Sequence, residues 1–164
     1  MAKKILRESP PEPVNYTLIG ISCHLKDYRL SWLINGKLRF ALAKQQDLVI
    51  TLPERKEPAA FSFYSYRDED QGFSYMLISN RSEEFVLIPE FKQLDFLLMV
   101  EGDCRRDRKE TLVKAISSVP NVLTAYEIKP ADIRNMGNLS AEIEMHLMKI
   151  FRKPKSIFEH QPNN

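Results

Sequence analysis

The feature that most constrains the fold is a run of apolar residues near the middle of the chain. From Leu94 to Val100 nearly every position is apolar, so both sides of an extended segment would need cover. Successive side chains of a strand point to opposite faces, and a strand that is apolar on both faces is placed most easily inside a sheet. The sequence therefore predicts a central strand that ends at Gly102 and is covered on both sides.

A helix and a further strand are predicted directly after this run. Asp107 is positioned to cap the helix, with Glu110 at the N3 position of a capping-box-like arrangement. Pro120 breaks the helix, and the β-branched and aromatic content of Val122–Ile128 is typical of a strand. The predicted buried stripe of the helix consists of Leu112, Ala115, Ile116 and Val119. The segment from residue 94 to residue 128 is therefore a strand–helix–strand unit.

The first part of the chain allows two interpretations. Tyr16–Ser22 is a strand-like run. The Asn35-Gly36 pair that follows is a hairpin signal, which would join residues 29–34 to residues 37–42. The alternative is a helix from about Asp27 to Gly36, with Leu25, Tyr28 and Trp32 near one face and Asn35-Gly36 at its end. We favour the helix, because three apolar residues run together at 32–34 and break the alternation of a strand.

The middle and the end of the chain supply the remaining elements. Residues 38–52 are expected to be extended, with a break near 44–47, and residues 53–58 form a charged loop. A hairpin is predicted from strands at 61–66 and 73–79, and Phe85–Ile88 is a short strand stopped by Pro89. Pro130 is expected to begin a short helix that ends near Gly137. A last amphipathic helix is predicted over about residues 141–151.

Together these elements predict one α+β domain with a mixed or antiparallel sheet, a strand–helix–strand unit and a C-terminal helix. Their order is compatible with a ferredoxin-like arrangement. The expected organisation is a flexible segment over 1–14, the α+β domain over 15–137, the amphipathic helix over 138–153 and a disordered tail over 154–164.

Length and composition point to one domain in the cytoplasm. A chain of 164 residues suits a single domain, and two cysteines, Cys23 and Cys104, are few for a disulfide-stabilised secreted protein. The basic N-terminus has no apolar segment behind it, and the longest apolar run is far too short to span a bilayer. The formal net charge of +2 is nearly neutral, so a role in nucleic-acid binding would have to rest on a local patch.

Several kinds of chemistry are excluded or disfavoured because the sequence lacks the motifs that they require. The five glycines are not spaced for a phosphate-binding or dinucleotide-binding loop. Cys23 and His24 are adjacent, and adjacent residues of a strand point to opposite faces, so they are not expected to form a thiol–imidazole pair. The three histidines and two cysteines are dispersed, which argues against a zinc site. We therefore expect no cofactor, metal or catalytic set.

One segment resembles a known family. Ile88, Pro89, Glu90 and Asp95 match the signature of the IPExxxVDY family, a group of bacterial proteins, with Leu94 and Phe96 in place of its Val and Tyr. The resemblance covers roughly residues 14–136, including segments 18–21, 26–30 (with Asp27 and Arg29) and 123–126. It implies a bacterial cytoplasmic origin, but it assigns no activity, ligand or catalytic residue that could be carried over to this chain. Its polar positions are nevertheless candidate site residues: Glu90, Asp95, Asp27 and Arg29.

Glu90 and Asp95 could act as an acid/base pair, but the interpretation we favour is structural. In it Glu90 caps or solvates the turn after Pro89, and Asp95 bonds backbone groups or an arginine, with Arg29 and Arg134 as candidate partners. Aromatic residues also gather on the predicted hairpin, where core packing is expected rather than stacking with RNA bases. These residues are Tyr64, Tyr66, Phe73 and Tyr75.

Basic residues gather at two places, and together they form a candidate patch for an anion or RNA. The first group lies at a predicted helix N-terminus, where cations are unfavourable by a few tenths of a kcal/mol, about 0.3 or more. That position hints at an anionic partner. The patch consists of Arg105, Arg106, Arg108, Lys109, Lys149, Arg152 and Lys153.

Three functions remain open from the sequence. The first is a non-enzymatic protein-interaction or regulatory module that binds another protein or a second copy of itself through a sheet face or the last helix. The second is an RNA-binding protein that uses the basic patch, with affinity that falls as salt rises. The third is a small-ligand sensor or an enzyme, supported only by analogy at the level of the fold.

Overall fold

The computed structural model describes residues 15–51, 57–83 and 85–152. The fold is α+β, as the sequence predicted. The flexible segment expected over 1–14, the tail expected over 154–164 and most of the charged loop expected over 53–58 lie outside the described residues. None of the described helices is long and apolar enough to cross a membrane.

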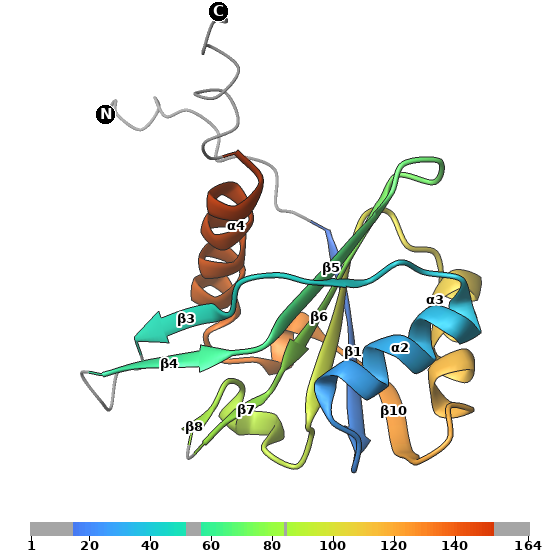
Figure 1. Ribbon diagram of the computed structural model, residues 1–164, viewed down its shortest axis with the longest axis horizontal. Helices are drawn as coiled ribbons and strands as arrows, with labels where there is room; N and C mark the ends of the chain where they lie inside the picture. Colours follow the sequence, from blue (N-terminus) through green and yellow to red (C-terminus); the bar gives the residue numbers. More distant parts are fainter. Residues whose placement is uncertain (1–14, 52–56, 84, 153–164) are drawn as a thin grey trace, which may run out of the picture.

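A six-stranded antiparallel sheet forms the centre of the molecule (Figure 1). Across the sheet, the strands are β10 (Val122–Ile128), β1 (Tyr16–Cys23), β9 (Phe96–Glu101), β6 (Phe73–Ser79), β5 (Phe63–Asp68) and β2 (Ala43–Lys44). Strand β9 lies between β1 and β6, and β1 lies between β9 and β10. The parallel strands β9 and β10 are therefore separated by β1, and the parallel strands β1 and β6 by β9. This is the strand order of the ferredoxin-like arrangement, here extended by β5 and β2, which precede β6 in the chain.

The predicted central strand is confirmed. The first five residues of β9 are all buried, and alternate residues enter two separate cores. Leu97 and Met99 belong to the core beneath the C-terminal helix, whereas Leu98 and Val100 belong to the core beneath the two other helices. The sheet therefore needs cover on both faces. Figure 1 shows α2 (Asp27–Leu38) and α3 (Arg106–Ser117) on one side and α4 (Met136–Arg152) on the other.

The helical interpretation of the ambiguous segment is confirmed, with a later end. Helix α2 runs Asp27–Leu38 and closes at Arg39, whose φ of 60° places it in the left-handed region. Asn35 therefore lies inside the helix, where its side chain accepts a hydrogen bond from the Leu42 N–H (2.9 Å) and donates one to the Leu42 carbonyl (3.1 Å). The buried face of α2 carries Leu30, Ser31 and Ile34.

Helix α3 runs Arg106–Ser117, and its predicted capping box is wrong. Arg105 occupies the cap position with extended backbone and no side-chain capping bond. Asp107 lies within the first turn, where its carboxylate accepts a hydrogen bond from the Arg108 N–H (2.9 Å). The core contacts of the helix are as predicted at Leu112 and Ile116, which are both fully buried.

Short elements and one long helix cover the other face of the sheet. The short strands are β3 (Leu48–Thr51), β4 (Pro58–Phe61), β7 (Arg81–Ser82) and β8 (Phe85–Val86). The helix predicted from Pro130 to Gly137 is wrong. Pro130 opens a single 3-10 turn, η2 (Pro130–Asp132), much as Pro89 opens η1 (Pro89–Phe91), and Gly137 lies inside the next helix.

Helix α4 runs Met136–Arg152, so it begins earlier than the predicted amphipathic pattern. It docks on its own domain, because Leu139 and Ile143 are buried in the core with β9. Two polar contacts add to this docking. The Tyr16 hydroxyl donates to the Glu144 carboxylate (3.2 Å), and His146 Nε2 lies 2.8 Å from the Gln46 carbonyl.

Candidate functional site

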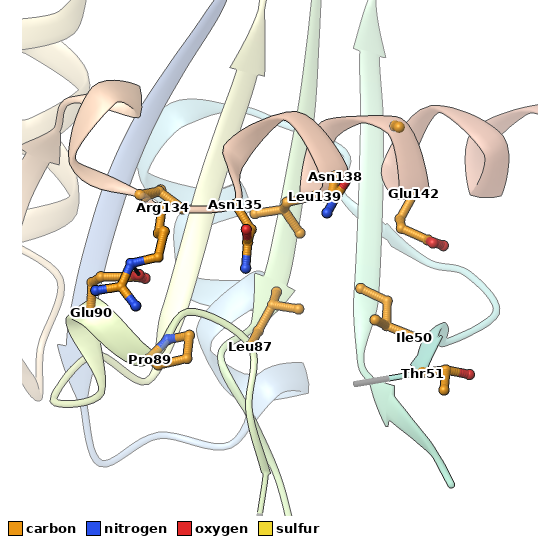
Figure 2. A pocket seen from close by; sticks show the side chains of 12 residues that line it. Ile50, Thr51, Leu87, Pro89, Glu90, Arg134, Asn135, Asn138, Leu139 and Glu142 are labelled. Atoms are coloured by element: carbon orange, nitrogen blue, oxygen red, sulfur yellow. Dashed lines mark ion pairs between the residues drawn. The ribbon is translucent and has the colours of Figure 1, made fainter. Parts of the chain in front are cut away.

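A cleft of about 390 Å³ lies between α4, β3 and the two 3-10 turns. We call it the α4 cleft (Figure 2). Figure 2 shows Asn135 and Asn138 projecting from the start of the α4 segment over a space that Leu87 and Ile50 enter from the other side. Its apolar lining is Ile50, Leu87, Pro89, Ile133, Leu139 and Ala141. Its polar lining is Thr51, Glu90, Arg134, Asn135, Asn138 and Glu142.

The wall of the cleft formed by η1 is held by one buried side chain, Asn80. Its Oδ1 accepts the Ile88 N–H (2.9 Å), and its Nδ2 donates to the carbonyls of Phe91 (3.0 Å) and Leu94 (2.9 Å). Its backbone carbonyl also accepts the Leu87 N–H. Asn80 is 1% exposed, and its amide satisfies the buried Ile88 N–H and Leu94 carbonyl, which lie outside the strands of the sheet. The sequence offers no periodic signal for such a residue.

The two asparagines at the mouth of the cleft are chemically available. Asn135 and Asn138 are exposed, and neither side-chain amide makes a hydrogen bond with any described residue. Each amide carries a donor and an acceptor. They lie beside an apolar lining, so a ligand could bury apolar side chains and pair its polar backbone in the same place.

Glu90 is the one residue of the predicted polar set that lines the cleft. Its carboxylate lies 3.8 Å from Arg134 Nε, in an ion pair whose arginine side chain is 82% exposed. Such an exposed pair adds about 0–1 kcal/mol to stability. The contact therefore leaves both side chains free to turn toward a ligand at little cost.

Asp95 has a structural position instead. Its Oδ2 accepts the Cys23 N–H (2.9 Å), and its Oδ1 accepts Arg81 Nε (2.9 Å). The expected partners Arg29 and Arg134 are wrong for Asp95, because Arg81 on β7 reaches it instead and also donates to the Lys92 carbonyl. Glu90 and Asp95 therefore do not act on a common centre.

Asp27 and Arg29 lie on α2, which covers the opposite face of the sheet. The Asp27 carboxylate accepts hydrogen bonds from the Tyr28 N–H (2.8 Å) and the Tyr64 hydroxyl (3.3 Å). The Arg29 guanidinium lies 5.3 Å from the centre of the Trp32 ring. The four polar candidates are thus distributed over three places and do not form one site.

The basic residues whose side chains the structure describes do not form a continuous patch either. Arg105 and Arg106 are exposed at the start of α3, whereas Lys109 is paired with Glu127 (3.2 Å). Lys149 lies on α4, across the sheet from α3. The side chains of Arg152 and Lys153 lie outside the described residues.

Arg108 turns from this patch toward the core. Its guanidinium lies over Phe73 (5.3 Å) and Tyr75 (5.9 Å) and donates to the Tyr75 hydroxyl. Its Nε is buried and has no partner among the described residues. Burial raises the pKa of the Tyr75 phenol, an effect that the arginine partly opposes. The hairpin aromatics accordingly pack in the core with Phe40, as expected.

The thiols and imidazoles that the structure describes show no arrangement for catalysis or metal binding. Cys23 is buried and His24 is exposed, which agrees with their predicted opposite orientations. Burial raises the pKa values of the Cys23 and Cys104 thiols, so both groups are weak nucleophiles near neutral pH. Among the described residues, no group of three His, Cys, Asp or Glu side chains could hold a metal ion.

An exposed apolar surface continues from the cleft along α4. A second hollow of about 140 Å³ shares Glu142 with the cleft and is also lined by Val49 and Met145. Helix α4 carries large apolar side chains on its outer side as well as on its buried side. Those with more than half of their surface exposed are Met145, Met148 and Phe151.

No protein-family model matches the chain, and no curated protein is similar to it in sequence. Membership of the IPExxxVDY family stays a prediction from the signature at residues 88–96.

Proposed function

We propose that the protein is a non-enzymatic interaction module whose α4 cleft holds an extended segment of a partner protein. The observation that carries the proposal is a pair of amides, Asn135 and Asn138, that make no hydrogen bond with any described residue and lie beside an apolar-lined cleft. Such amides can hydrogen-bond to the N–H and C=O groups of an extended peptide, while its side chains enter the apolar lining.

The exposed outer side of α4 supports the same proposal. Surface helices of globular proteins usually carry polar residues opposite their buried stripe, and α4 instead exposes Met145, Met148 and Phe151. Methionine side chains adapt to partners of different shape. We propose that this surface extends the contact beyond the cleft, and that the protein acts in the bacterial cytoplasm.

RNA binding is the weaker candidate, because the basic residues on which it depended lie on opposite faces of the sheet or are already engaged. A sensor or enzyme is also weaker. Glu90 and Asp95 lie apart, and the cleft contains no nucleophile paired with a base among the described residues.

Affinity purification from the protein's own cells, read by mass spectrometry, tests the proposal. The bait is the tagged full chain, compared with an Asn135→Ala/Asn138→Ala variant and with Asn15→Ala as a control, since Asn15 is exposed outside the cleft. We expect at least one protein partner that survives nuclease, is lost from the double variant and is kept by Asn15→Ala. Equal recovery by all three baits, or no partner at all, would refute the proposal.

A further inference from the structure

The outer face of α2 exposes two large aromatic side chains. Tyr28 is 66% exposed and Trp32 is 64% exposed, and they lie one helical turn apart on the same side of the helix. Trp32 is the only tryptophan of the chain. The opposite face of α2 supplies the core contacts through Leu30 and Ile34, so the aromatic pair does not contribute to the buried core.

Gly36 lies one further turn along the same face. A Cβ added at Gly36 would meet no atom within 4 Å, so the packing of the protein does not require glycine there. Glycine in a helix interior is nevertheless unfavourable. The residue borders a shallow trough of about 570 Å³, between the second half of α2 and the connection from α3 to β10. The trough is lined mainly by Trp32, Leu33, Gly36, Lys37, Val119 and Pro120.

The charges of α2 define what could occupy this trough. The helix and its two flanking positions carry four cations, and in the described part of the chain none of them makes an ion pair. These cations are Lys26, Arg29, Lys37 and Arg39. The acidic residue of the helix, Asp27, is bound to Tyr64. Lys37 is the charged residue of the lining. An acidic partner is therefore favoured, and a second copy, which would bring the same cations, is disfavoured.

The hydrogen-bonding groups of the trough further restrict the kind of ligand that could occupy it. Asn35 also lines the trough, but both ends of its amide are bound to the Leu42 backbone. The trough therefore presents apolar surface rather than free groups that could recognise the edge of a nucleobase. An apolar side chain is the better occupant.

We infer that the α2 trough binds an acidic segment of another protein, which inserts one large apolar side chain between Trp32 and Pro120, above Gly36. Tryptophan and arginine are the residue types on which binding energy concentrates at protein interfaces. This site is independent of the α4 cleft, because it lies on the opposite side of the sheet (Figure 1). The protein could then hold two partners at once.

The test is selection of a random-peptide phage library on the full chain. We expect the recovered peptides to share one large apolar residue flanked by Asp or Glu. A fluorescein-labelled copy of the most enriched peptide is then titrated and followed by anisotropy. Gly36→Gln fills the trough with a residue that favours helix and should weaken binding about 30-fold. Lys37→Glu should weaken binding about tenfold.

Two controls separate this site from other effects. Lys129→Glu changes an exposed cation outside the trough and should leave the affinity unchanged, as should Asn138→Ala in the α4 cleft. Circular dichroism and a thermal midpoint no lower than that of the wild type would show that Gly36→Gln is folded.

Other outcomes would overturn the inference. They include recovery of no common peptide, peptides without acidic residues, and affinities that Gly36→Gln and Lys37→Glu leave unchanged. Quenching of Trp32 fluorescence by a 12-nucleotide poly-uridine RNA would point to nucleic acid instead. A dimer that Trp32→Ala dissociates in sedimentation would point to a second copy.

Discussion

The carboxylate of Asp95 accepts a hydrogen bond of 2.9 Å from the backbone N–H of Cys23. This bond joins the start of the central strand to the end of β1, where the register between β1 and β10 shifts and the ladder is irregular. Arg81 holds the other carboxylate oxygen. An acidic side chain at this position thus replaces pairing that the strands themselves do not provide.

Asp95→Ala is expected to lower the free energy of unfolding by about 1–2 kcal/mol, because the Cys23 N–H and Arg81 both lose a charged acceptor. Urea unfolding at neutral pH measures the change. Asp103→Ala is the control, since Asp103 is exposed and its side chain makes no described contact. A variant at position 95 as stable as the control would contradict the account of this residue.

Asn80→Ala is expected to be more costly, about 3 kcal/mol, because the buried Ile88 N–H and Leu94 carbonyl lose their amide partner at once and the Phe91 carbonyl loses one of its two donors. The same urea measurement applies, with Asn15→Ala as the matched exposed control. Since these bonds help to hold the η1 wall of the cleft, hydrogen exchange over residues 87–94 should also accelerate. Unchanged exchange there would show that the wall is held by something else.

Two glycine substitutions should change stability in opposite directions. Gly36→Ala is expected to raise the free energy of unfolding by about 0.5–1 kcal/mol, because the added methyl meets no atom and favours helix. Gly20→Ala is expected to lower it by about 1–3 kcal/mol, because its methyl would press on Leu94 and lie 2.8 Å from Ile128 Cδ1. Thermal unfolding of both variants beside the wild type measures the two changes in stability. A less stable Gly36→Ala together with a more stable Gly20→Ala would refute the packing described for α2 and β1.

Stability should fall at alkaline pH. Burial raises the pKa values of the Cys23 and Cys104 thiols and of the Tyr75 phenol in the folded protein. Above the ordinary thiol pKa of about 8.5, the unfolded chain releases protons that the folded chain still holds. The free energy of unfolding then decreases as pH rises.

Urea unfolding between pH 7.5 and 10.5 measures this dependence. The Cys23→Ala/Cys104→Ala variant should lose stability less steeply than the wild type over the lower part of that range. A wild-type stability that stays constant or increases toward pH 10.5 would contradict the burial of these groups.

The elements that the sequence predicted are those for which local and tertiary requirements agree. The β9 run is apolar on both faces, and only an interior strand satisfies it. In α2, consecutive apolar residues at 32–34 outweighed the hairpin signal of Asn35-Gly36. The predictions of secondary structure failed where one local sequence signal is compatible with two different elements. A proline opens a 3-10 turn as readily as an α-helix, and Gly137 lies within α4 because Leu139 and Ile143 pack on the core.

The candidate site was harder to predict. The signature at residues 88–96 led to Glu90 in the cleft, but Asn80, Asn135 and Asn138 gave no signal. An asparagine has no periodic pattern, and its role depends on which backbone groups the fold brings within reach. The exposure of Trp32 could not be predicted either. An aromatic residue at helical spacing gives the same sequence pattern whether it lies on the buried face or on the outer face of the helix.

Site-specific photo-crosslinking from the α4 cleft tests the central claim most directly. A photo-reactive amino acid replaces Ala141, an exposed residue of the cleft lining, in the full chain at native expression level. The control chain carries it at Lys129, outside the cleft. The account predicts that irradiation in living cells joins position 141 to a defined peptide of another protein and that position 129 yields no such adduct. No adduct from position 141, or the same adducts from both positions, would contradict the assignment of the α4 cleft as a binding site for a partner protein.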